Sequence, residues 1–207
     1  MNHLVLIGAS GFGREVLWVC RRAGLDAAGF CDDAADKQAG VFCGLPLLGT
    51  VEQAAARLGA GTRFHCAVGD NRARRTLAGR ALALGWTPET VVDPTALVAP
   101  EAELGAGCYV GLYSVVSCGA QLGPGVIVNH HVTVGHDCRI DGFAQLCPGV
   151  RVSGGCTLGE GALMGSNTVL IPGRTMGAWS VLAVGADGLR DIPAGATVLR
   201  SRAESRP

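Results

Sequence analysis

The chain has 207 residues, enough for one or two domains. Lysine plus arginine and aspartate plus glutamate number 17 each, so the formal net charge is zero and nothing indicates a nucleic-acid or anionic-membrane partner. No apolar run is long enough to span a bilayer, and the N-terminus lacks the pattern of a secretory signal, so we expect no membrane association.

The first part of the chain alternates predicted strands with predicted helices. The strands are expected at residues 4–7, 27–31 and 64–68, and two of the helices at 14–22 and 71–84. A further helix follows Thr50, which has the residue type of an N-cap, with Gln53 three residues on. This alternation predicts a small parallel α/β domain over residues 1–92.

The turn after the first strand is rich in glycine. Gly8, Gly11 and Gly13 let the backbone approach a ligand, and the N–H groups of the following helix would face a phosphate. The spacing is G-x-x-G-x-G rather than the dinucleotide pattern G-x-G-x-x-G, so the turn alone is a weak signal and a purely structural turn stays an alternative. A nicotinamide cofactor is disfavoured because nothing else in so short a domain supplies a hydride-transfer site. Asp32, at the end of the second strand, is placed to accept hydroxyl hydrogens from a ribose.

From residue 98 to residue 182 an aliphatic residue occupies every sixth position. These residues are Val98, Leu104, Val110, Val116, Leu122, Val128, Val134, Ile140, Leu146, Val152, Leu158, Met164, Leu170, Met176 and Leu182. The residue two positions earlier is small or β-branched in every case except Arg174. One short strand and a tight turn fit this period, with both residues facing the same side. Three such edges make one coil, which predicts a parallel β-helix of about five coils over 93–195, followed by a tail over 196–207.

Nine cysteines are scattered along the chain without any C-x-x-C pair. Cys108, Cys138 and Cys156 occupy the small inward position of the repeat, where cysteine acts as a small hydrophobic residue. An odd number of scattered thiols favours a reducing cytoplasm over a disulfide framework.

His130, His131 and His136 cluster within seven residues. His130 and His136 each fall two places after an aliphatic residue, so both are expected at outward-pointing corners. An imidazole can take a proton from an attacking amine or hydroxyl, and the adjacent Asp137 could hold its tautomer. Solvated surface histidines and a zinc site based on His131 and His136 are the alternatives. The chain offers no third histidine at a suitable coil position, so we expect no metal.

Six short motifs spread over nearly the whole chain belong together. They are Gly8-Ala9-Ser10-Gly11-x-Gly13, Phe30-Cys31-Asp32-Asp33, Gly135-His136-Asp137-Cys138-x-Ile140, Pro148-Gly149-Val150, Ile171-Pro172-Gly173 and Asp191-Ile192-Pro193. With these motifs the chain resembles the hexapeptide-repeat sugar O/N-acetyltransferases of the sialic acid and bacillosamine type.

The resemblance implies a Rossmann-like N-terminal domain followed by a left-handed β-helix, assembled as a homotrimer with active sites between subunits. It implies acetyl transfer from acetyl-CoA, as co-substrate, to an amino group of a nucleotide-linked sugar, with a hydroxyl as the less favoured acceptor. Because the sequence pairs no cysteine or serine with His136, we expect direct attack on the thioester rather than an acyl-enzyme. The expected setting is cell-surface glycan biosynthesis in the cytoplasm.

The resemblance also implies roles for individual residues. His136 would be the general base, Asp137 its partner, and Asn129 a neighbour of the acceptor amine. The implied substrate-binding residues are Gly8, Ser10, Gly11, Phe12 and Gly13 at the phosphates, and Asp32 and Asp33 at the uridine end. The residues implied to line the CoA groove are Gln145, Gly154, Ser166 and Gly185.

Three positions depart from the family pattern. Phe12 stands where close relatives have histidine, and Gln145 stands where a second histidine is common. The C-terminal signature G-x-P-A-[KR] is replaced by Arg200-Ser201-Arg202-Ala203-Glu204. Two other functions therefore stay open, a zinc hydratase of the γ-carbonic-anhydrase type and a non-catalytic scaffold that binds sugar nucleotides.

Overall fold

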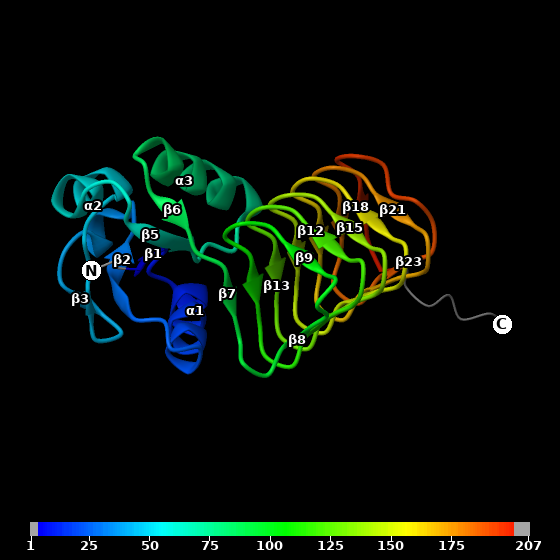
Figure 1. The fold of residues 1–207 in the computed structure, drawn as a ribbon. Helices are drawn as coiled ribbons and strands as arrows, with labels where there is room; N and C mark the ends of the chain where they lie inside the picture. Colours follow the sequence, from blue (N-terminus) through cyan, green and yellow to red (C-terminus); the bar gives the residue numbers. More distant parts are fainter. Residues whose placement is uncertain (1–3, 201–207) are drawn as a thin grey trace.

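The computed structural model describes residues 4–200 and shows an α/β domain joined to a three-sided solenoid of parallel strands (Figure 1). Within these residues no helix has the length and apolar character needed to cross a membrane. The altered C-terminal signature lies almost wholly outside the described residues.

The N-terminal domain is a four-stranded parallel sheet flanked by helices. Its main elements are β1 (Leu4–Ile7), α1 (Gly11–Arg22), β2 (Ala27–Cys31), α2 (Val51–Leu58), β5 (Arg63–Cys66), α3 (Asn71–Ala83) and β6 (Thr87–Pro88). The strand order is β2-β1-β5-β6, and a 3-10 turn (Ala35–Lys37) and a hairpin of β3 (Val41–Phe42) and β4 (Leu45–Pro46) follow β2. Every predicted element is present, with ends shifted by three residues at most. Thr50 caps α2 in a capping box with Gln53, as predicted.

The solenoid has three faces, each a stack of two-residue parallel strands. The first face contains β7 (Val91–Val92), β10 (Tyr109–Val110), β13 (Ile127–Val128), β16 (Gln145–Leu146), β19 (Leu163–Met164), β22 (Val181–Leu182) and β24 (Thr197–Val198). The second face contains β8 (Leu97–Val98), β11 (Val115–Val116), β14 (Thr133–Val134), β17 (Arg151–Val152), β20 (Val169–Leu170) and β23 (Asp187–Gly188). The third face contains β9 (Glu103–Leu104), β12 (Gln121–Leu122), β15 (Arg139–Ile140), β18 (Thr157–Leu158) and β21 (Thr175–Met176). Seven stacked strands on the first face define six turns, one more than the repeat predicts.

The solenoid extends past both expected boundaries. Val92 stands six residues before Val98, so β7 is in step with the repeat and pairs with β10 two residues before the expected start at 93. At the other end β24 pairs with β22 inside the segment expected to be a tail. The partners Val181 and Thr197 are 16 residues apart rather than 18, so the last coil is two residues short and the six-residue count breaks there.

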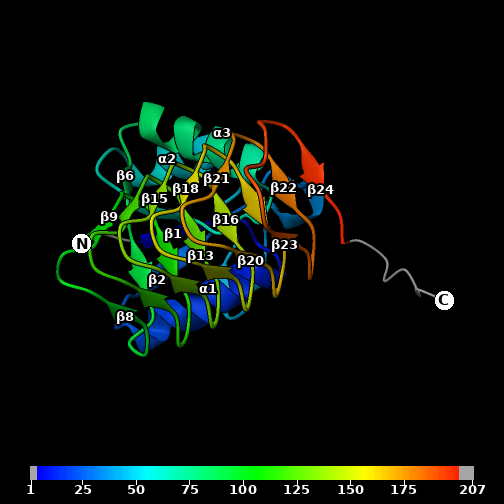
Figure 2. The same ribbon diagram turned by 90° about the vertical axis from the view of Figure 1, so that its right-hand side faces the viewer.

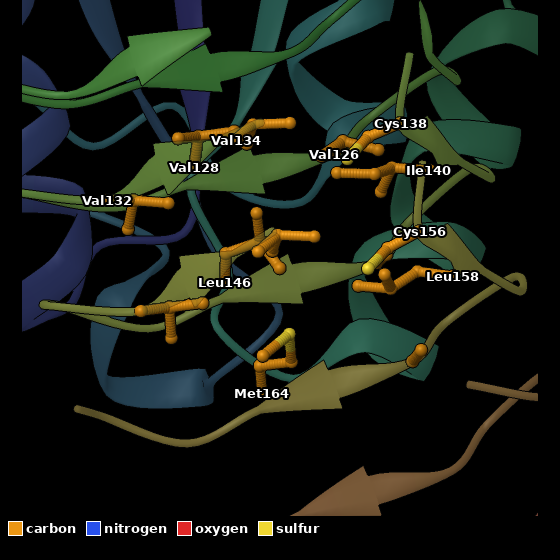
Figure 3. Packing of buried hydrophobic residues seen from close by; sticks show 14 of the residues in the cluster. Val126, Val128, Val132, Val134, Cys138, Ile140, Leu146, Cys156, Leu158 and Met164 are labelled. Carbon is orange, nitrogen blue, oxygen red and sulfur yellow. The ribbon is translucent and has the colours of Figure 1, made fainter. Parts of the chain in front are cut away.

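The aliphatic residues of the repeat fill the interior of the prism (Figure 3). All but the first two, Val98 and Leu104, are at most 4% exposed. The three inward cysteines are buried as predicted, and each Sγ lies 3.1 to 3.2 Å from a carbonyl oxygen of the next coil. The exception at the small position, Arg174, has a side chain 42% exposed and lies 4.0 Å from Asp191 beside the shortened coil.

The N-terminal domain packs on the first coils of the first face. Outward side chains of three strands there, Val91, Tyr109 and Ile127, are buried in one cluster with Leu4 and Val16 of the domain. Figure 2 looks toward the C-terminal end of the solenoid, with α3 lying along one edge of it. That edge is the corner between the third and first faces.

Arg74 on α3 joins the two domains. It is 1% exposed and donates to the carbonyl oxygens of Val68 (3.0 Å) in its own domain and of Gly125 (3.1 Å) and Phe143 (2.7 Å) in the solenoid. Every acceptor that it has within residues 4–200 is a carbonyl or amide oxygen, and burial lowers the pKa of its guanidinium to about 10. A buried cation is tolerated here because carbonyl dipoles surround it.

His65 on β5 gives the fold a pH dependence. Its Nδ1 lies 2.9 Å from the carbonyl oxygen of Glu89, and burial lowers the pKa of the imidazole from 6.5 to about 4. As the pH falls from about 6.5 toward 4 the unfolded chain binds this proton first, so the free energy of unfolding decreases. His65→Asn keeps a donor for Glu89 but does not titrate. We expect urea unfolding at pH 7.5 and 5.0 to show a loss about 2 kcal/mol smaller in this variant than in the parent.

His131→Asn serves as the control, because His131 is exposed. This variant should keep the pH dependence of the parent. Equal losses in the parent and in His65→Asn would contradict the assignment.

Candidate functional site

The glycine-rich turn opens onto a cavity of about 340 Å³ at the carboxyl ends of the parallel strands. Four of the sequence-predicted residues line it: Gly8, Ser10, Asp32 and Asp33. Ser10 is the N-cap of α1, yet its side chain makes no capping hydrogen bond. Its hydroxyl and the first N–H groups of α1 are therefore available to an anion.

Close packing explains two glycines of this turn. Gly8 has a φ of +113°, and a Cβ there would lie 2.7 Å from the carbonyl oxygen of Ala67. A Cβ at Gly13 would lie 2.0 Å from the carbonyl oxygen of Gly8. The strand and helix thus approach too closely for any side chain.

The two aspartates at the end of β2 are already engaged within the domain. Asp32 accepts backbone N–H groups of Ala9 (2.8 Å) and Ala34 (2.9 Å), so it holds the turn against the next loop. Asp33 accepts from Arg80 at 3.1 Å, and Arg80 also holds Glu52, whose pKa it lowers to about 2. Any uridine or ribose contact by these carboxylates would use their remaining lone pairs.

Phe12 lies outside the cavity. Its ring packs edge-on against Tyr109 of the solenoid, with ring centroids 5.4 Å apart. The cavity lining also leaves out Gly11 and Gly13. Phe12 therefore contributes to the domain interface.

A second cavity, of about 330 Å³, lies between the start of α3 and the first face. Its lining includes Gly69, which also lines the first cavity, and Gln145, Cys147 and Trp179 of the solenoid. The Oε1 atom of Gln145 lies 3.5 Å from Arg74 Nη1. The two cavities are thus neighbours on the same side of the chain.

Two arginines of α3 contact the aromatic ring at the edge of this second cavity. The guanidinium of Arg72 lies 4.1 Å from the Trp179 ring centroid and that of Arg75 lies 5.9 Å from it. Trp179 covers Gly161 of the preceding coil, where a Cβ would lie 2.4 Å from the ring. These contacts hold α3 against the corner between the third and first faces.

His136 and Asp137 form a hydrogen-bonded pair at the corner between the second and third faces. His136 Nδ1 lies 2.8 Å from Asp137 Oδ2, and the two side chains are 66% and 73% exposed. Asp137 has a φ of +57°, a conformation that aspartate tolerates in a tight corner. With Nδ1 bound to the carboxylate, Nε2 is the ring atom available to a substrate proton.

The other clustered histidines do not join this pair. His130 points away from the prism interior, as predicted, but its side chain is half-buried, with Nε2 3.4 Å from Glu15 on α1. The reason is that α1 covers its corner. His131 stacks on Tyr113, with ring centroids 5.3 Å apart, at the corner between the first and second faces. Within residues 4–200 no three His, Cys, Asp or Glu side chains are grouped to hold a metal ion.

One chain does not bring all the expected site residues together. Gly154 stacks beside His136 at the corner of the second and third faces, whereas Ser166 and Gly185 stack at the corner of the first and second faces. Asn129 is 8% exposed and its Oδ1 accepts the backbone N–H of His130. Gln145 lies on the first face, in the second cavity.

Sequence reasoning missed Arg74, the residue that links the N-terminal domain to the solenoid. The available signal was its position on α3. Arg74 is in helical step with the buried Ala78 and Ala81, so a charged residue falls on an apolar helix face.

Comparisons with known proteins add a family context. A family model described as the PglD N-terminal domain matches residues 3–81. An uncharacterized protein from Acanthamoeba polyphaga mimivirus is 26% identical over 121 residues, which are 58% of this chain and 24% of that protein. This chain therefore spans only a minor part of that relative's length.

Two solved structures are similar over almost the whole chain. A mutant of perosamine N-acetyltransferase from Caulobacter crescentus, in complex with CoA and GDP-perosamine, is 29% identical with a TM-score of 0.89, covering 95% of this chain and 93% of that one. The acetyltransferase domain of PglB from Neisseria gonorrhoeae, in complex with acetyl coenzyme A, is 34% identical with a TM-score of 0.87, covering 95% of each chain. The handedness implied by the resemblance holds, and the solenoid is a left-handed parallel β-helix.

Proposed function

The chain belongs to the hexapeptide-repeat sugar acetyltransferases, and from this membership we propose that it acetylates an amino group of a nucleotide-linked sugar with His136 as general base. The protein is an acyltransferase with acetyl-CoA as co-substrate. The observation that carries the proposed mechanism is the hydrogen bond between His136 Nδ1 and Asp137 Oδ2 on an exposed corner.

The proposed reaction is direct transfer. The sugar amine attacks the thioester carbonyl, His136 Nε2 takes the amine proton, the C–N bond forms and the C–S bond breaks. The imidazolium then returns the proton to the CoA thiolate, so the base is regenerated. Asp137 supports this cycle because its carboxylate stabilises the charged ring. An amine is favoured over a hydroxyl because it attacks without a strong base.

We propose that the acceptor's nucleotide occupies the cavity at Gly8, Ser10, Asp32 and Asp33. The Ser10 hydroxyl, at the N-cap of α1, supports diphosphate binding there, and the carboxylates support hydrogen bonding to a base or ribose. From this cavity the sugar would extend past Gly69 toward Gln145 in the second cavity. GDP-perosamine, bound by the Caulobacter enzyme, is one acceptor of this class.

We further propose a homotrimer in which a neighbouring copy completes the site. The N-terminal domain covers the first coils of the first face, while His136 lies at the corner of the other two faces. The two cavities and the His136–Asp137 pair of one chain therefore lie on different sides. The second face is the more apolar exposed face, with Val115 and Val169 outward and Leu97 68% exposed. The third face instead presents residues such as Glu103 and Arg139. The cytoplasmic location and the glycan-biosynthesis role stay predictions.

The acceptor assignment can be tested with a panel of amino-sugar nucleotides carrying GDP, UDP, dTDP or CMP. We expect one of them to raise the melting temperature, because a ligand that binds the folded state stabilises it. With acetyl-CoA the same compound should gain one acetyl group by mass spectrometry. Ser10→Phe should abolish the acceptor-induced shift by filling the cavity mouth, while the shift caused by CoA remains.

Two results would contradict this acceptor assignment. If CoA binds but no amino-sugar nucleotide shifts the melting temperature or is acetylated, the acceptor class is wrong. If Ser10→Phe leaves acceptor binding intact, the cavity is not its site.

A further inference from the structure

The His136–Asp137 pair lies between two glycines on neighbouring coils. One coil is 18 residues. Gly154 therefore lies next to His136 on the following coil, and Gly119 lies next to Asp137 on the preceding coil. The same corner also contains Gly155 and Gly173. Of these four glycines, only Gly119 and Gly154 approach the pair closely.

Gly154 supports the imidazole ring. A Cβ built on it would lie 2.5 Å from His136 Nε2, 2.7 Å from Cε1 and 2.9 Å from Cδ2. These distances are shorter than real carbon contacts allow. All three atoms lie on the part of the ring farthest from the His136 backbone. The ring therefore occupies the volume that any side chain at 154 would need.

Gly119 provides the matching space for the carboxylate. A Cβ there would lie 2.5 Å from Asp137 Oδ1. Gly119 also has a φ of +68°, which glycine adopts without strain. Gly155 and Gly173 have the same φ of +68°, yet a Cβ on either would meet no atom within 4 Å. The corner conformation alone therefore does not account for the close contact at Gly119.

We propose that Gly154 and Gly119 are positioning residues that set the geometry of the His136–Asp137 pair. The proposal rests on His136 being the general base. The hydrogen bond to Asp137 fixes one side of the imidazole, and contact with the Gly154 backbone fixes its face. Two exposed side chains on a surface corner are thereby held in one arrangement before substrate binds, which is the preorganisation that proton transfer needs.

The consequence of an added methyl group differs from ordinary destabilisation. The imidazole is the end of a flexible side chain, so Gly154→Ala would turn the ring aside while the coil stays folded. A displacement of about 1 Å at a reacting group can lower turnover about 100-fold. We therefore expect a fall in kcat without a matching fall in melting temperature.

The test compares Gly154→Ala and Gly119→Ala with Gly173→Ala and Gly155→Ala. Gly119→Ala, Gly155→Ala and Gly173→Ala introduce the same backbone strain, so the last two are matched controls for the first. We expect kcat to fall at least about tenfold in Gly154→Ala and Gly119→Ala and less than twofold in the controls. The Kd of CoA, measured by calorimetry, should stay within threefold of the parent value in Gly119→Ala, Gly155→Ala and Gly173→Ala.

The position of the His136 ring can also be followed by NMR, without turnover. In protein labelled with ¹³Cε1-histidine, the His136 resonance is assigned by its loss in His136→Asn. Its chemical shift should change in Gly154→Ala and stay unchanged in Gly173→Ala. An unchanged resonance and unchanged kcat in Gly154→Ala would overturn the proposal. So would a tenfold rise in the Kd of CoA with kcat preserved at saturation, since Gly154 would then act on CoA alone.

Failure of the proposed function is recognised separately. If His136→Asn retains the parent's kcat, His136 is not the base, whatever the glycine variants do. If His136→Asn loses turnover and Gly154→Ala does not, only the positioning role is wrong.

Discussion

Replacing His136 with asparagine is expected to lower kcat by at least about 100-fold, the lower range for loss of a general base. Asparagine keeps a polar side chain at the corner but cannot take the amine proton. Because the pair is exposed and packs against no core residue, the variant should melt within about 1 °C of the parent. The measurement is the initial rate of CoA release with the acceptor identified in the panel. His131→Asn, at a different corner, should keep the parent's rate.

Mixed assemblies can show whether neighbouring copies share one site. His136→Asn lacks the base, and Ser10→Phe lacks the acceptor cavity. If the site forms between copies, unfolding and refolding the two variants together should restore part of the activity that each lacks alone. If mixed assemblies that mass spectrometry shows to contain both chains recover no activity, the cavity of one chain and the His136–Asp137 pair of its neighbour do not form a shared site.

Arg74→Met is expected to destabilise the protein by on the order of 3 kcal/mol. Methionine matches the length of the arginine stem but leaves the carbonyl oxygens of Val68, Gly125 and Phe143 without their donor. Each buried acceptor left unpaired costs about 1 kcal/mol or more. For a chain of this size the melting temperature should fall by roughly 6–12 °C. Differential scanning calorimetry measures this shift.

Arg75→Met is the matched control on the adjacent residue of the same helix. Its side chain is 54% exposed and pairs with Glu160 at the surface, so the same substitution should cost less than about 1 kcal/mol. Similar losses in the two variants would show that Arg74 acts as an ordinary surface charge. Arg74→Met should also lower kcat, because Arg74 Nη1 lies 3.5 Å from Oε1 of Gln145, a residue of the proposed site.

The parts of the fold that repeat could be predicted, because a period requires only local rules. The six-residue spacing predicts which residues are buried, and it explains Cys108, Cys138 and Cys156 as packing residues. Its count fails where the last coil loses two residues between Gly188 and Ile192. A repeat contains no information about its own interruption, so it does not predict β24.

Contacts between the domains could not be predicted in the same way. His130 and His136 have the same place in the repeat, yet α1 covers one and leaves the other exposed. Arg74 and Phe143 are 69 residues apart and share no period. The chemistry of the candidate site was visible in the motif around His136, whereas the packing that half-buries His130 depends on where the N-terminal domain sits.

The Arg74 contacts determine where the acceptor cavity lies along the length of the prism. Phe143 and His136 belong to the same coil, seven residues apart, so one of the coils that Arg74 holds also carries the His136–Asp137 pair. Each further coil lengthens the prism by about 4.8 Å without moving either of them. The height of the His136–Asp137 pair relative to the cavity is thus independent of the total number of coils, and evolution can lengthen or shorten the C-terminal part of the solenoid while the two stay level.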